Sequence, residues 1–182
     1  MMENTLYTIT VYSENHVGLL SQIALMFTRR KLNIENLSVS ASAVQGIHKF
    51  TILLKCSERS VKNVVSQIEK RIDVIRAFYY VDSDIFTQEI ALYKVSTPSL
   101  LAKGGIGQIV SRFSVKVLEV NEAYTIIEKS GTREKIQELY DELTHYNMLQ
   151  FARSGRVSIT KSKVEEVSLF LEEQEKRRIE TE

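Results

Sequence analysis

The chain has 182 residues and a mass of 20.9 kDa, enough for one ordinary domain or two small ones of roughly 80 residues. Its 24 lysines and arginines nearly balance 23 aspartates and glutamates. A net charge of +1 argues against the broad basic field that attracts nucleic acid or an anionic membrane. Small molecules and other proteins are therefore the expected partners.

The cysteine count and the apolar runs indicate a cellular compartment. Cys56 is the only cysteine, which excludes an internal disulfide and a cysteine-rich zinc or iron-sulfur site. The first residues lack the order of basic segment, apolar stretch and cleavage site that marks a secretion signal. No apolar run approaches the ~20 residues that a membrane span requires. These features favour a cytoplasmic protein.

The first half of the chain alternates two hydrophobic periods. A period of two predicts strands, and apolar residues at i, i+3, i+4 and i+7 predict amphipathic helices. In chain order the pattern predicts a strand, a helix, a hairpin of two strands, a second helix and a last strand. These elements are expected over residues 6–12, 20–27, 37–43 with 48–55, 61–68, and 74–81. The first helical stripe consists of Leu20, Ile23, Ala24 and Phe27.

The second half repeats this order of elements. The expected positions are a strand over 89–95, a helix over 106–113, strands over 115–120 and 124–129, a helix over 136–143, and one long strand over 149–160. The fold class is therefore α+β, with two ferredoxin-like βαββαβ domains and antiparallel sheets. We expect the domains over residues 5–84 and 85–160.

A charged tail follows over residues 161–182. Its apolar line, Val164, Val167, Phe170 and Leu171, predicts a terminal helix that docks at its start and frays at its end. In each domain both helices are expected on one sheet face, which leaves the other face uncovered. An uncovered apolar face and an open sheet edge favour a homodimer.

A search for catalytic residues finds no active site. The three histidines, His16, His48 and His145, have no cysteine or carboxylate at the spacing of a zinc motif. The glycines at 104, 105 and 107 lack a full phosphate-binding pattern and are typical of a flexible helix start. An RNA-binding ferredoxin-like protein stays open as an alternative, although the charge balance argues against it.

The turn between the first strand and the first helix is the most informative segment. Gly18 allows the backbone to approach a ligand closely, and free N–H groups at the positive end of a helix suit a carboxylate. Asn15 adds a side-chain donor and acceptor. Asparagine and glycine also form ordinary turns and caps, so these residues leave both interpretations open.

Several motifs in this order resemble the ACT-domain family of acetolactate synthase (acetohydroxyacid synthase) small regulatory subunits. They are Asn15-His-Val-Gly18-Leu-Leu-Ser21, Asn33-Ile-Glu-Asn-Leu-Ser-Val39, Ile72-Asp73-Val74, Gln88-Glu-Ile-Ala-Leu-Tyr-Lys-Val95 and Ala152-Arg153-Ser154-Gly155. The resemblance runs from about residue 6 to residue 160. It implies an N-terminal ACT domain and a C-terminal ACT-like domain.

This resemblance implies a regulatory subunit with no catalytic residues and no cofactor of its own. Its partner is the large catalytic subunit, on which thiamine diphosphate, magnesium and FAD are expected. The small subunit raises the activity of that partner and confers feedback inhibition by valine. A free-standing sensor with two ACT domains is the alternative.

The resemblance also implies an effector site between two paired ACT domains. One domain contributes its first turn and the other the junction between its first helix and second strand. On this sequence the ligand shell is Asn15, His16, Val17, Gly18, Leu19 and Leu20, with Asn33 and Ile34 opposite. The resemblance implies that the effector is valine or another branched-chain amino acid. Relatives commonly carry other residues where His16, Gln22 and Lys31 stand, and these differences leave open which of these amino acids binds. The turn at 97–101 lacks the Asn-x-x-Gly pattern, and we expect no effector there.

Overall fold

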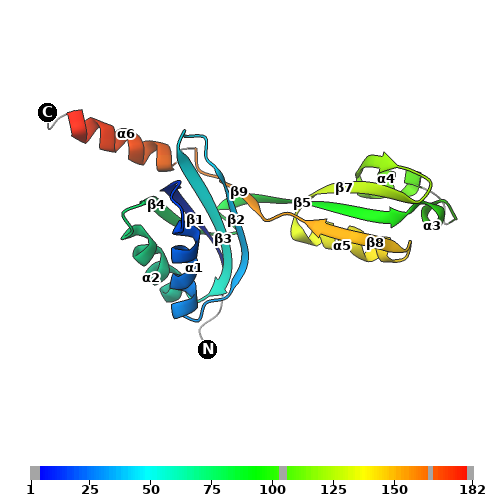
Figure 1. Ribbon diagram of the computed structural model, residues 1–182, viewed down its shortest axis with the longest axis horizontal. Coiled ribbons are helices and arrows are strands. Elements are labelled where there is room, and N and C mark those ends of the chain that lie inside the picture. The colour runs from blue at the N-terminus through cyan, green and yellow to red at the C-terminus, as the bar shows by residue number, and fades with distance from the viewer. Residues whose placement is uncertain (1–4, 103–105, 164–165, 180–182) are drawn as a thin grey trace. The chain divides into compact units, whose positions relative to one another are not determined.

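The computed structural model describes residues 5–102, 106–163 and 166–179 (Figure 1). The chain divides into two compact units. The first contains Met1–Phe86 together with Ser158–Glu182, and the second contains Thr87–Val157. The segment after residue 160 thus groups with the first unit. The predicted α+β class with two antiparallel sheets is confirmed.

The first unit contains one four-stranded antiparallel sheet in the order β2-β3-β1-β4. Its elements are β1 (Thr5–Glu14), α1 (Leu19–Arg29), β2 (Ile34–Ala41), β3 (Ile47–Cys56), α2 (Glu58–Glu69) and β4 (Val74–Val81). Figure 1 shows α1 and α2 side by side on one face of this sheet. The predicted βαββαβ order is confirmed.

The core of the first unit lies between these two helices and the sheet. The buried residues of α1 are Leu19, Ile23, Met26 and Phe27, and those of α2 are Val61, Val64, Val65 and Ile68. Leu20, which the sequence pattern placed in the stripe, is 45% exposed. That placement was wrong because the buried stripe runs through Leu19, Ile23, Met26 and Phe27, at i, i+4, i+7 and i+8, and Leu20 lies outside it.

Cys56 ends β3 and belongs to this core, where it is 3% exposed. Burial raises the pKa of the thiol, although a hydrogen bond with the backbone of Val61 opposes that change. A raised pKa leaves little thiolate at neutral pH, and the thiolate is the reactive form. We therefore expect Cys56 to react slowly with a thiol reagent in the native protein and rapidly in denaturant. The labelling rate is measured from the absorbance of the chromophore that the thiol reagent releases when it reacts. Fast labelling of the native chain would contradict this expectation.

The second unit contains an antiparallel sheet in the order β6-β7-β5-β8, and β9 pairs with β5. Its elements are β5 (Ile85–Ser96), α3 (Thr97–Ala102), α4 (Ile106–Phe113), β6 (Lys116–Val120), β7 (Tyr124–Gly131), α5 (Arg133–Thr144) and β8 (Met148–Arg153). All of β9 (Val157–Thr160) except Val157 is assigned to the first unit. Tyr93 at the centre of its core donates a hydrogen bond to the carbonyl of Ile136 over 2.7 Å.

Two expectations for the second unit were wrong. The segment from Thr97 is the short helix α3 and not a turn, because the Ser96 hydroxyl accepts from the N–H of Ser99 and proline is tolerated in a first helical turn. The long closing strand is divided into β8 and β9. After β8 the N–H of Ser154 still donates to the carbonyl of Ile90 over 2.8 Å, but the N–H of Ile90 donates to the Ser154 hydroxyl over 2.9 Å, so a side chain replaces one of the two backbone bonds at this point.

The expectation of an uncovered sheet face was wrong for the first unit. Helix α6 (Glu166–Ile179) packs on the face opposite α1 and α2, where Val167 is 1% exposed beside Tyr12 and Ile47. The carbonyl of Ser158 accepts a hydrogen bond from the Lys49 ammonium over 2.9 Å on the same face. The chain therefore covers this face with its own last segment. None of the helices in the described ranges is long and apolar enough to span a membrane.

Candidate functional site

The turn between β1 and α1 ends in a glycine with a left-handed backbone. Gly18 has φ +88° and is the N-cap residue of α1, with no side-chain cap hydrogen bond. Its carbonyl accepts from the N–H of Gln22 over 3.1 Å, which closes the first helical turn. The first N–H groups of a helix have no partner within it, so an uncapped helix start can receive an anion such as a carboxylate.

The side chains predicted around this turn differ in their exposure. Asn15, His16, Val17 and Leu20 are exposed, and Val17 is fully so. Leu19 is 2% exposed and packs in the core of the first unit. The N–H of Leu19 donates to the carbonyl of His16 over 3.3 Å, so Leu19 offers an effector neither its side chain nor its N–H, whereas Val17 and Leu20 can offer apolar side chains.

Asp73, to which the sequence analysis gave no role, connects this turn to the start of β4. Its carboxylate oxygen lies 2.7 Å from His16 Nδ1, and its carbonyl accepts from the N–H of Glu14 over 3.0 Å. The second ring nitrogen of His16 lies 3.6 Å from the Glu14 carboxylate. The only sequence signal at Asp73 was the Ile72-Asp73-Val74 motif. That motif supported the family resemblance but did not indicate that Asp73 contacts His16.

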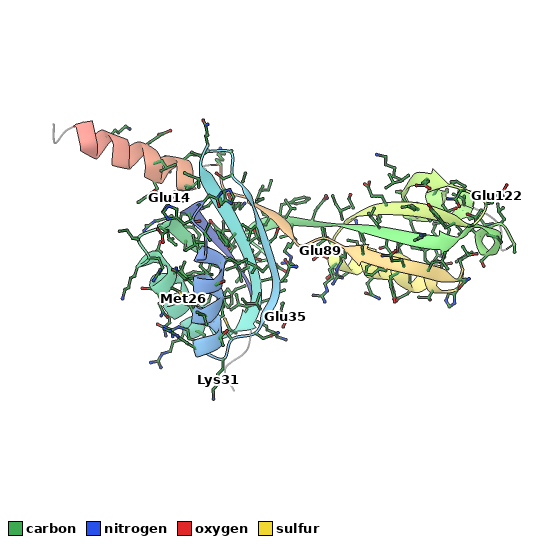
Figure 2. All side chains as sticks on the ribbon, in the orientation of Figure 1. Glu14, Met26, Lys31, Glu35, Glu89 and Glu122 are labelled. Carbon is green, nitrogen blue, oxygen red and sulfur yellow. The ribbon has the colours of Figure 1, made fainter. Side chains whose placement is uncertain are left out.

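The other predicted half of the site lies at the far end of α1. Asn33 is exposed and its side-chain amide donates to the Glu35 carboxylate over 3.1 Å, while Ile34 packs partly against the core. Helix α1 has 11 residues, which separates the two halves by about 16 Å at 1.5 Å per residue. Figure 2 labels Glu14 and Glu35, next to the two halves, at opposite ends of the first unit. One chain thus does not bring all eight predicted residues together.

Other candidate groups do not form a second site. Within the described ranges no three histidines, cysteines or carboxylates cluster as a metal ion would require. The glycines at 104 and 105 lie outside the described residues.

Comparison with known proteins gives a consistent result. Residues 9–76 match the family described as AHAS small subunit-like ACT domain, and residues 88–162 match the family described as small subunit of acetolactate synthase. The chain is 30% identical over 155 residues to the acetolactate synthase small subunit of Mycolicibacterium smegmatis, covering 85% of this chain and 91% of that one. This chain belongs to the acetolactate synthase small subunit family.

Two further relatives extend this similarity. The small subunit of Aquifex aeolicus is 31% identical over 169 residues, covering 93% of this chain and 86% of that protein. The crystal structure of the small subunit from Thermotoga maritima superimposes with a TM-score of 0.78 at 25% identity, covering 87% of this chain and 99% of that one. Membership of this family implies a regulatory role beside a catalytic large subunit.

Proposed function

We propose that this chain is the regulatory subunit that activates a thiamine-diphosphate-dependent acetolactate synthase catalytic subunit and makes it sensitive to valine or another branched-chain amino acid. Similarity to the small subunits over 85% to 87% of this chain supports the partner. The observation that carries the effector assignment is the uncapped helix start at Gly18, with exposed apolar side chains beside it. Backbone N–H groups there bind the carboxylate of the amino acid, and Val17 and Leu20 contact its apolar side chain.

The effector site requires two copies of the chain. Because α1 separates the first turn from Asn33 and Ile34, the first turn of one copy faces the junction of the other in a homodimer. In the first unit α6 covers one sheet face, so pairing uses the exposed edge of the sheet and the helix ends instead of face-to-face stacking. Val17 and Ile72 are almost fully exposed beside the turn, and a partner copy and an effector cover them.

The chain contributes regulation and no chemistry. Thiamine diphosphate, magnesium and FAD reside on the catalytic subunit, and this chain holds none of them. Both subunits act in the cytoplasm, in the biosynthesis of branched-chain amino acids.

The central experiment mixes the purified chain with the catalytic subunit from the same organism and measures acetolactate formation. We expect no synthase activity from the chain alone, a several-fold higher rate from the mixture, and inhibition of the mixture by valine. The catalytic subunit with bovine serum albumin is the control. A chain that neither binds the catalytic subunit nor changes its rate contradicts the proposal and favours a free-standing sensor of another protein.

Asn33→Ala is expected to weaken effector binding without preventing it. The side chain is exposed, and one hydrogen bond to a charged group contributes about 1 to 2 kcal/mol, equivalent to roughly 5- to 30-fold in the valine concentration for half inhibition. Valine titration of the reconstituted enzyme measures this change. Asn63→Ala, at an exposed position of α2, is the matched control and leaves the titration unchanged.

A further inference from the structure

A basic groove runs between α1 and α2 on the outer surface of the first unit. The groove has a volume of about 340 Å³. It is lined by Gln22, Leu25, Met26 and Arg29 from α1, by Gln67 from α2, and by Lys70 and Arg71 immediately after α2. Figure 2 labels Met26 on α1 and Lys31 just beyond the end of that helix. No residue of the predicted effector shell lines this groove.

The charge of the groove is unbalanced. Its lining contains three basic residues and no acidic one, and Arg30 adjoins it through a 3.0 Å hydrogen bond to Gln67. Among the described residues, no carboxylate lies within salt-bridge distance of Arg29, Arg30, Lys70 or Arg71. The nearest acidic side chain of α2, Glu69, is paired instead with Arg76 at 3.2 Å. A protein of net charge +1 thus concentrates four cations here without an acidic partner in the described ranges.

Part of this arrangement has a structural explanation. Arg29 lies in the last turn of α1, and Arg30 and Lys70 are the C-cap residues of α1 and α2, where cations stabilise the negative end of a helix dipole. Arg71 is not explained in this way. Its Nε is buried and has no hydrogen-bond partner in the described part of the chain, and its guanidinium bonds the neutral amide of Gln22. A buried guanidinium N–H without an acceptor is unfavourable unless a ligand supplies one.

The lining of the groove also contains two apolar side chains. Leu25 is 50% exposed, and Met26, the next residue of α1, is buried. The cations are distributed along the groove, because Gln22 beside Arg71 and Arg29 at the other end are about 10 Å apart along α1 at 1.5 Å per residue. A single phosphate engages cations that converge on one point. A row of cations with an apolar side chain among them instead complements a peptide segment that carries several acidic side chains and an apolar one between them.

We propose that the groove between α1 and α2 is the docking site for an acidic segment of the catalytic subunit, with carboxylates on Arg29, Lys70 and Arg71 and an apolar side chain on Leu25. The inference rests on the proposed function for the identity of the partner. Binding there neutralises the cluster of like charges and gives the Arg71 guanidinium, which bonds the neutral amide of Gln22, a negatively charged partner. It also leaves the effector turn, which precedes the start of α1, free for the amino acid.

The test measures the affinity of the full-length chain for the catalytic subunit at low and high salt. We expect Arg29→Glu/Lys70→Glu to weaken binding at least 10-fold at low salt and to reduce its salt dependence. The control Arg133→Glu/Lys135→Glu makes the same change of charge at exposed positions of α5 and is expected to bind like the wild type. Leu25→Ala is expected to weaken binding several-fold, and thermal unfolding verifies that each variant is folded.

The outcomes separate this inference from the proposed function. If the wild type does not bind the catalytic subunit, the proposed function fails. If the wild type binds and the groove variants bind equally well, the function stands and the docking inference is overturned. If inorganic phosphate binds the wild type but not Arg29→Glu/Lys70→Glu, while both bind the catalytic subunit equally, the groove is a small-anion site and the docking inference is likewise overturned.

Discussion

Gly18→Asp is expected to abolish inhibition by valine while the catalytic subunit remains activated. The new carboxylate lies at the helix start where the carboxylate of the effector binds. Two unit charges 4 Å apart near a protein surface repel by about 4 kcal/mol, so the valine concentration for half inhibition rises on the order of 100-fold or more. Activation is retained because the basic groove and the core are unchanged. Valine titration of the reconstituted enzyme measures both effects.

The variant is expected to fold. A Cβ at Gly18 meets no heavy atom within 4 Å, so the cost is that of the backbone at φ +88°. Aspartate adopts the left-handed region more readily than most residues. Gly46→Asp is the matched control, because Gly46 has φ +80° and equally open space but lies in the hairpin between β2 and β3. Undiminished inhibition of a folded Gly18→Asp complex would place the effector site elsewhere.

Deleting the residues after Lys163 is expected to destabilise the first unit. The deletion removes α6, which follows the last residue matched to the family, 162. It exposes Tyr12 and Ile47 and removes the burial of Val167, with a cost of about 2 kcal/mol for one fully buried aliphatic side chain. The cation–π contact of Arg76 over the Phe170 ring, at 5.1 Å, is lost as well.

The lone thiol gives a selective measurement of this effect. Cys56 lies in the core of the first unit, so its rate of labelling in increasing urea follows the unfolding of that unit and not of the second. Val167→Ala removes two buried methyl groups and is expected to lower the free energy of unfolding by about 1.5 kcal/mol. Leu169→Ala, at a position 45% exposed, is the control and is expected to change it little. Equal labelling curves for Val167→Ala and the wild type would mean that α6 does not pack on the sheet in solution.

The predicted position of the effector turn required no tertiary information. Both the glycine and the asparagine are within one local motif, and the change from period two to period 3.6 indicates where the strand ends and the helix begins. The same local signals predicted the strand and helix order of the first unit, and in the second unit they missed α3 and the division of the last strand. The family followed from short motifs in a constant order.

Local patterns could not predict contacts between distant residues. The connection of His16 to Asp73 spans 57 positions and that of Lys49 to Ser158 spans 109. The division of the last strand at Ser154 depended on the side chain reaching Ile90, 64 positions earlier. Such pairs carry no periodic signal, because their geometry exists only after the sheet has formed.

The fold class, the family and the turn that receives the proposed effector could be predicted from local patterns, because each is encoded by residues close together in the chain. The packing of the folded chain was needed to reveal that α6 lies on one sheet face, that α1 separates the two halves of the effector site, and that four cations from two helix ends line or adjoin one groove. The net charge of the whole chain, +1, gives no sign of this local excess of cations. The excess becomes visible only when packing places Arg29, Lys70 and Arg71 along one groove while the neighbouring acid, Glu69, pairs with Arg76.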